Sequence, residues 1–105
     1  MTEIVICDYA RSAFTPAKKG KLAKTRPDDL AAEVVKGLIE KNKINPNDVE
    51  DLILGCAFPE AEQGMNLARN VVFLANLPNS VGGVTVNRFC ASSMQAIHQA
   101  AGAIK

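Results

Sequence analysis

A cysteine followed by small and hydroxyl-bearing residues is the feature of this sequence best suited to chemistry. Residues 84–97 read VTVNRFCASSMQAI, so a short apolar run leads into Cys90 and then into alanine and two serines. Small residues allow a sharp turn from a strand into a helix, and such a turn presents a nucleophile to its substrate. The N–H groups at a helix start stabilise a thiolate or a developing oxyanion. Cys90 is therefore the candidate nucleophile.

A second interpretation of Cys90 is a buried, inert cysteine, and its position alone leaves both open. A catalytic cysteine needs a base. The single histidine, His98, follows eight residues later, which is roughly 12 Å along a helix axis. That distance is too long for His98 to act directly on Cys90, so a surface or packing role is expected for it. Cys7 and Cys56 lie within apolar runs and are expected to be structural.

The remaining polar clusters are weaker candidates. Glu60 and Glu62 lie in a polar loop without an evident partner and are expected to be solvated. Five basic residues between Lys18 and Arg26 could meet ligand phosphates, but a solvated loop is the favoured interpretation. The pair Gly20-Lys21 lacks the surrounding residues of a phosphate-binding Walker loop.

Composition narrows the class of protein. The 105 residues suffice for one small domain, and 48% hydrophobic with 22% charged residues is typical of a globular protein. A net charge of +1 and only 5% aromatic residues argue against nucleic-acid or membrane partners. No apolar run has the length of a membrane span, and the N-terminus lacks the apolar core of a signal peptide. Three widely spaced cysteines predict neither disulfides nor a metal site, and they favour a reducing, cytoplasmic compartment.

Alternating elements predict the fold class. Apolar β-branched runs predict three strands, and periodic apolar positions predict three helices. The first helix carries Leu30, Val34 and Leu38 at helical spacing, with Ala31 and Val35 on the neighbouring edge. The last helix carries an apolar stripe of Met94, Ile97, Ala101 and Ile104. The order β-α-β-α-β-α predicts a mostly parallel three-stranded sheet in a layered α/β/α arrangement. The strands are expected over residues 3–10, 51–58 and 81–89, and the helices over 27–43, 66–77 and 91–105.

Such a sheet is small for its apolar content. Strands that are apolar on both faces require covering layers on both sides. The sequence is therefore expected to form part of a larger α/β unit.

The segment VNRFCASSMQAIHQAAGAI resembles the active-site cysteine segment of the thiolases. Asn87 stands three places before the cysteine, and a small residue and then a hydroxyl residue follow it. The stretch 63–78, QGMNLARNVVFLANLP, is similar to the loop and helix that precede this segment in the family. The strand-like EIVICDYARS and the helix PDDLAAEVV also fit, so the resemblance covers nearly the whole chain.

The resemblance implies a function for the full-length protein. Cys90 would attack the 3-keto carbonyl of a 3-ketoacyl-CoA, release acetyl-CoA and pass the acyl group to coenzyme A, and the reverse condensation is equally implied. Coenzyme A thioesters are substrates, so no cofactor or metal is expected. The wording around Cys90 is closest to the degradative 3-ketoacyl-CoA thiolases, and a homodimer or homotetramer is implied.

The resemblance also limits what this chain does alone. Residues 1–105 correspond to the front part of the family's N-terminal domain, and the activating histidine and second cysteine lie further along. The chain alone is expected to be inactive. Ser12-Ala13 replaces the usual Thr-Pro, and Ala91 replaces a common glycine beside the nucleophile. The alternatives are another condensing enzyme of the superfamily, such as a ketoacyl synthase, and a non-catalytic α/β association module.

Overall fold

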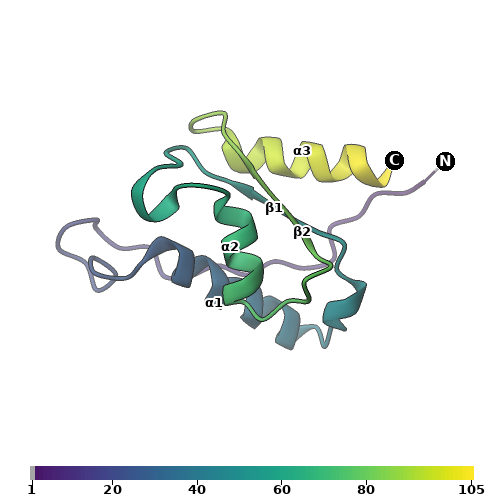
Figure 1. The fold of residues 1–105 in the computed structure, drawn as a ribbon, viewed down its shortest axis with the longest axis horizontal. Coiled ribbons are helices and arrows are strands. Elements are labelled where there is room, and N and C mark those ends of the chain that lie inside the picture. Colours follow the sequence, from purple (N-terminus) through teal and green to yellow (C-terminus); the bar gives the residue numbers. More distant parts are fainter. Residues whose placement is uncertain (1) are drawn as a thin grey trace.

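The computed structural model describes residues 2–105 and contains two strands and three α-helices (Figure 1). Pro27 begins the first helix, where its missing N–H costs nothing, and Asp28 and Asp29 lie at the positive end of the helix dipole. Short 3₁₀ turns follow at Pro46–Asp48 and Ala61–Gln63. The main elements are α1 (Pro27–Lys41), β1 (Asp51–Gly55), α2 (Leu67–Leu74), β2 (Gly82–Val86) and α3 (Ser92–Ile104).

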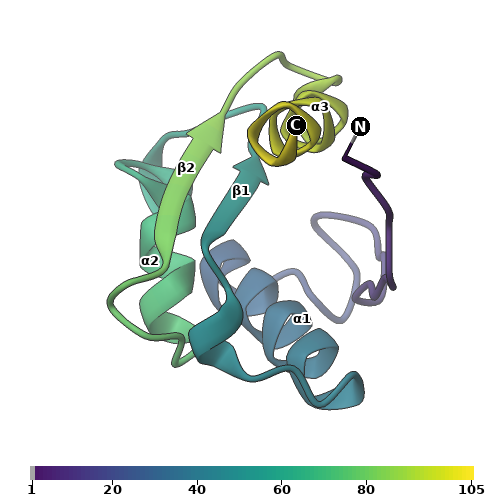
Figure 2. The same cartoon turned by 90° about the vertical axis from the view of Figure 1, so that its right-hand side faces the viewer.

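The two strands pair in parallel and lie between helical layers. The register runs from Asp51 opposite Gly82 to Gly55 opposite Val86. In Figure 2, α3 covers one face of the sheet, and α2 covers the other with α1 packed beside it. The predicted α/β class, the parallel pairing and the layered arrangement are confirmed.

The predicted strand at residues 3–10 is wrong, and the described sheet has two strands rather than three. The segment runs apart from β1 and reaches the last turn of α1 (Figure 2). There Asp8 accepts hydrogen bonds from the Asn42 amide at 2.8 Å and from Lys41 at 3.1 Å. These bonds, with that from the Tyr9 N–H, lower the pKa of Asp8 to about 2. Apolar β-branched residues favour extended backbone, but a strand also requires a partner in the ladder.

The core lies between the sheet, α1 and α2. Val71, Val72 and Val81 are fully buried there, and Ala32 brings α1 against them. Of the apolar positions predicted for α1, Ala31 and Val35 pack against this core. Leu30, Val34 and Leu38 are only half-buried, because the face with Ala32 meets the core instead.

The apolar stripe predicted for α3 is also displaced from the core. Met94, Ile97 and Ile104 are exposed, and Ser92 and Ala96 are the buried residues of the helix. Small side chains bring α3 close to the strands, and this rotates the larger side chains away from the sheet. Within residues 2–105, no helix combines the length and the apolar character needed to cross a membrane.

The regular elements are shorter than predicted, for local reasons. The ladder ends where the Cys56 N–H donates to the Val86 carbonyl, so residues 56–58 and 87–89 leave the sheet. Helix α2 ends at Leu74, and Asn76 then adopts a left-handed conformation with φ of 57°.

Candidate active site

Cys90 lies in the tight turn that joins β2 to α3, and it is exposed. The turn from strand to helix predicted from the sequence is therefore present, and the interpretation of Cys90 as a buried residue is wrong. Among the described residues, the N–H groups of Cys90 and Met94 make no hydrogen bond. Unpaired N–H groups at a helix start are suited to an anionic sulfur or oxygen.

Side-chain hydrogen bonds close this turn. The buried Ser92 hydroxyl donates to the Phe89 carbonyl at 2.6 Å and accepts from the Arg88 N–H at 2.8 Å. The Asn87 amide oxygen accepts from the Phe89 N–H at 2.8 Å. Phe89 itself has φ of 45°, a left-handed conformation that is uncommon for a bulky residue. The sequence marks Ser92 as a small, hydroxyl-bearing residue after Cys90, but it predicts neither the burial of Ser92 nor these bonds.

Gly55 allows α3 to begin directly against the end of β1. A Cβ atom on Gly55 would lie 2.4 Å from the Ser93 nitrogen, closer than any side chain can approach. The backbone contact therefore fixes the first turn of α3, which follows Cys90, against the sheet. This glycine carried no signal in the sequence, because its role depends on a segment nearly forty residues later.

The second segment of the family resemblance supports β2 from the other face. The Asn66 amide donates to the Gly83 carbonyl at 2.8 Å, and its oxygen accepts from the Thr85 hydroxyl at 2.8 Å. The Ala68 N–H donates to the same hydroxyl at 3.0 Å. Arg69 donates to the carbonyls of Val81 and Asn79. These residues hold the start of α2 on the strand that leads to Cys90.

Apolar side chains adjoin the turn. The rings of Phe58 and Phe89 meet edge to face, with centroids 6.3 Å apart. Phe58 and Phe89 follow the ends of β1 and β2, so parallel pairing brings them to one end of the sheet.

The other candidate residues lie elsewhere or serve the structure. Cys56 is buried, as predicted, but Cys7 is exposed because its segment forms no strand. His98 is exposed on α3. Glu62 lies 3.5 Å from Arg26, which corrects the expectation that it has no partner. The four lysines of the basic loop are exposed, as a solvated loop requires, and the described residues form no group of metal-ligating side chains.

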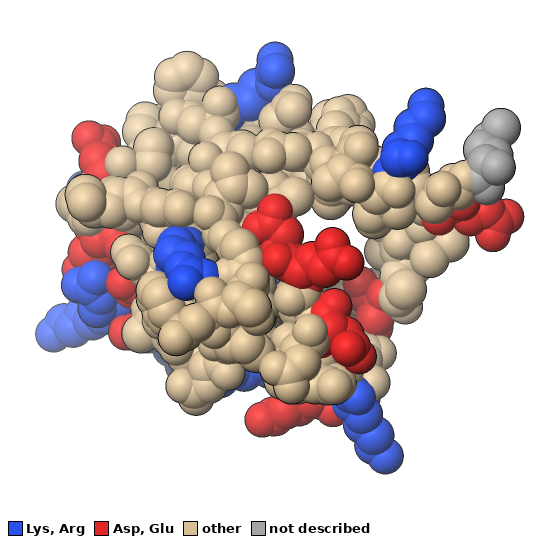
Figure 3. All heavy atoms as spheres, turned by 45° about the vertical axis from the view of Figure 1, so that its right-hand side comes forward, with Lys and Arg blue, Asp and Glu red and all other residues tan. Residues whose placement is uncertain are grey.

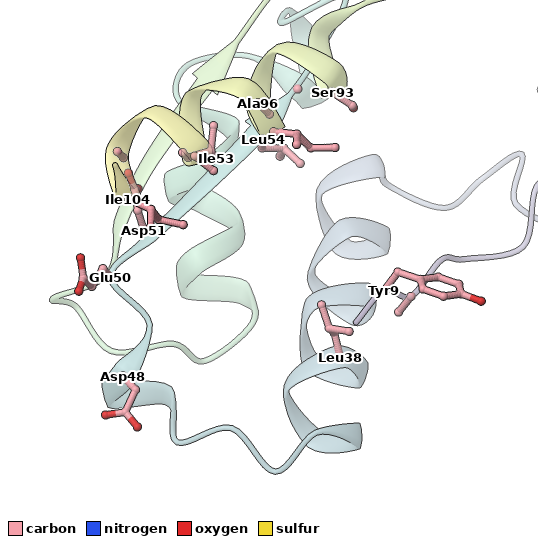
Figure 4. Close-up of a pocket in the computed structure, with 15 residues that line it drawn as sticks. Tyr9, Leu38, Asp48, Glu50, Asp51, Ile53, Leu54, Ser93, Ala96 and Ile104 are labelled. Atoms are coloured by element: carbon pink, nitrogen blue, oxygen red, sulfur yellow. The ribbon is translucent and has the colours of Figure 1, made fainter. Parts of the chain in front are cut away.

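A separate groove does not include Cys90. It encloses about 970 Å³ between the N-terminal segment, α1, β1 and α3. Figure 4 shows Leu38 and Ile104 on its apolar walls, with Asp48, Glu50 and Asp51 at one end. Acidic side chains lie along part of the border of a hollow on this side of the molecule (Figure 3). Carboxylates repel phosphates, so this groove does not suit a nucleotide-bearing thioester.

Comparison with known proteins identifies the family. Residues 4–105 match the model of the thiolase N-terminal domain. The chain is 52% identical over 102 residues to a 3-ketoacyl-CoA thiolase of Acinetobacter baylyi. The matched residues make up 97% of this chain and 26% of that protein. The chain is 48% identical to a 3-ketoacyl-CoA thiolase of Psychrobacter arcticus with the same coverage.

A solved structure agrees. The Acat5 thiolase from Ascaris suum, crystallised in complex with coenzyme A, superposes with a TM-score of 0.75 at 32% identity, over 82% of this chain and 22% of that one. The chain thus spans about a quarter of the length of the relatives it matches. A family match across residues 4–105, together with an exposed cysteine at the turn where the resemblance requires it, shows that this chain belongs to the thiolase family.

Proposed function

We propose that the complete protein carrying this chain is a thiolase-type acyltransferase and that Cys90 is its nucleophile. The observation that carries the proposal is the exposed Cys90 at the β2–α3 turn, in the segment that resembles the family's active-site cysteine. Relatives about half identical to this chain are named 3-ketoacyl-CoA thiolases, and a solved relative binds coenzyme A. The substrate class is therefore a 3-ketoacyl-CoA with coenzyme A as acceptor.

The reaction is a double displacement. The Cys90 thiolate adds to the 3-keto carbonyl, and the carbon–carbon bond on the side of the thioester breaks to leave acyl-Cys90 and the carbanion of acetyl-CoA. A proton from an acid completes acetyl-CoA, and the coenzyme A thiolate then displaces Cys90 to form the shortened acyl-CoA. The unpaired N–H groups at the start of α3 are suited to stabilising the anionic sulfur of Cys90.

Within residues 2–105, the one histidine is not placed to act as the base of the first step. His98 is exposed on α3, and its position in the helix separates it from Cys90 by about two turns. We propose that the base and the second acid come from residues outside this chain, and that the 105-residue polypeptide alone is inactive. We also propose a homodimer or homotetramer in the cytoplasm, with coenzyme A thioesters as substrates and no further cofactor.

Thiolysis of acetoacetyl-CoA by the complete protein tests the proposal. The parent is expected to form acetyl-CoA, and Cys90→Ala is expected to abolish turnover. Cys7→Ala is the matched control, because Cys7 is also an exposed free thiol and lies outside the turn. Turnover that survives Cys90→Ala, or that Cys7→Ala also abolishes, would remove Cys90 from the role of nucleophile.

The alternatives make different predictions. A condensing enzyme of the ketoacyl synthase type would form acyl-Cys90 but would not cleave acetoacetyl-CoA with coenzyme A. A non-catalytic association module would neither cleave the substrate nor become acylated. The identity to 3-ketoacyl-CoA thiolases favours the first proposal over both.

A further inference from the structure

We infer that the Ser92 hydroxyl is a positioning group for the nucleophile, holding the turn in the one conformation that presents Cys90. This inference rests on the proposed function, since it assigns Ser92 a part in the same reaction. Ser92 is two residues beyond Cys90 and is 4% exposed, although serine is usually a surface residue.

Burial of this hydroxyl is matched by its hydrogen bonds. It donates to the Phe89 carbonyl at 2.6 Å and accepts from the Arg88 N–H at 2.8 Å. Both partners precede Cys90 and Ser92 follows it, so the hydroxyl links the two sides of the turn around the nucleophile. The Ser92 N–H also donates to the Phe89 carbonyl at 3.1 Å, so this carbonyl accepts two hydrogen bonds from Ser92.

The conformation held by these bonds is not one that the backbone adopts by preference. Phe89 has φ of 45°, where the Cβ atom is crowded by the adjacent backbone. Without the Ser92 hydroxyl, Phe89 loses a bond that opposes relaxation to a right-handed conformation. Such relaxation changes the direction of the backbone at Cys90, the next residue.

Ser92, on the helix side of the turn, is held in place by the sheet. Helix α3 begins at Ser92, and Gly55 contacts the backbone of Ser93 so closely that a Cβ atom there would lie 2.4 Å from its nitrogen. Ser92 is therefore anchored to the sheet, and its hydroxyl transmits that fixed position to Arg88 and Phe89. The hydroxyl touches neither substrate nor sulfur in this mechanism, and it acts through the backbone on either side of Cys90.

The test compares Ser92→Ala with Ser93→Ala in the complete protein. Ser93 is exposed, and its hydroxyl makes no hydrogen bond within residues 2–105, so the control removes the same atom from the adjacent position. Acetoacetyl-CoA and coenzyme A are the substrates, and kcat and KM are measured separately. We expect Ser92→Ala to lower kcat by about tenfold or more with KM changed by less than about twofold, because misplacement of a reacting group slows chemistry at unchanged substrate binding. Ser93→Ala should leave both near the parent values.

Two further variants distinguish positioning of Cys90 by the Ser92 hydroxyl from a general contribution of Ser92 to stability. Ser92→Thr keeps the hydroxyl and should recover most of the lost kcat. Asn87→Ala, at an exposed site, removes the acceptor of the Phe89 N–H and should lower kcat in the same manner even if Ser92→Ala fails to fold. Parent-like kcat in folded Ser92→Ala, or in Asn87→Ala when Ser92→Ala does not fold, would overturn the inference.

Alkylation of Cys90 separates this inference from the proposed function. The rate of modification by iodoacetamide at pH 8 is followed on the Cys90 peptide by mass spectrometry, and it requires no acyl transfer. A parent that alkylates at Cys90 but does not cleave acetoacetyl-CoA would refute the proposed function. In that case, a rate changed severalfold by Ser92→Ala and not by Ser93→Ala would still support the positioning of Cys90, and equal rates would refute it.

Discussion

A Cβ atom on Gly55 would lie 2.4 Å from the backbone nitrogen of Ser93, so the end of β1 and the first turn of α3 are in backbone contact. The contact sets how closely the helix approaches the sheet, and Cys90 lies in the turn immediately before that helix. The placement of the candidate nucleophile therefore depends on a glycine 35 residues away in the sequence.

Gly55→Ala is expected to destabilise the complete protein and slow thiolysis. The added methyl group meets backbone rather than a flexible side chain, so α3 must move, and overpacking of this kind costs about 1–3 kcal/mol of the free energy of unfolding. Urea unfolding and kcat measure the two effects. Stability and turnover equal to the parent would show that the contact between β1 and α3 is not tight.

Gly37→Ala is expected to have the opposite effect. Gly37 lies within α1, and nothing lies within 4 Å of a Cβ atom added there. Alanine is favoured over glycine in a helix interior by about 0.8–1 kcal/mol, so the free energy of unfolding should rise by up to that amount. The same urea titration gives the result, and a loss of stability would contradict the open surroundings of this residue.

Thr85→Val is expected to weaken the attachment of α2 to β2. The Thr85 hydroxyl accepts from the N–H of buried Ala68 and donates to the exposed Asn66 amide. Valine keeps the shape but leaves the Ala68 N–H without this partner, whereas Asn66 can bond water instead. Loss of the partner of one buried donor costs about 1–3 kcal/mol of the free energy of unfolding. Thr85→Ser retains the hydroxyl and is the control. A Thr85→Val protein as stable as Thr85→Ser would show that these hydrogen bonds contribute nothing.

The ion pair at the start of α1 predicts a dependence on pH. Hydrogen bonds from Arg26 to Asp28 lower the pKa of the Asp28 carboxyl, and the pair measures 2.9 Å. Asp28 has a lower pKa in the folded state than in the unfolded state, where the pKa is about 3.9. The ion pair therefore stabilises the fold fully above the unfolded-state pKa, and this stabilisation is lost as pH falls through the folded-state pKa. Asp28→Asn should therefore lower Tm at pH 7, and the difference from the parent should shrink below about pH 4. A Tm difference between the parent and Asp28→Asn that stays constant from pH 7 to 3 would show that the Asp28 carboxylate does not stabilise the fold through this ion pair.

Local patterns in the sequence predict much of this structure. Pro27 and the two aspartates after it mark the start of α1, and the apolar run that ends before Cys90 marks β2 and the turn. These features depend on neighbours a few residues away, so they can be read along the chain. The alternation of strands and helices then gives the parallel pairing.

Features that depend on distant segments were predicted poorly. Residues 3–10 have the composition of a strand, but composition does not determine whether a partner edge is available to them. The stripe with Met94 and Ile97 has helical spacing, yet Gly55 and the small residues Ser92 and Ala96 determine which face of α3 meets the sheet. The hydrogen bonds of Ser92 were missed for the same reason, because a serine in a turn gives no sign of its burial.

Acylation of Cys90 is the most direct test of the central claim. The complete protein is mixed with acetoacetyl-CoA in the absence of free coenzyme A, quenched in acid and digested, and the peptide that contains Cys90 is weighed. We predict an acetyl group on Cys90 that disappears when coenzyme A is added before the quench. An unmodified Cys90, or an acetyl group found instead on Cys7 or Cys56, would contradict the assignment of Cys90 as the nucleophile.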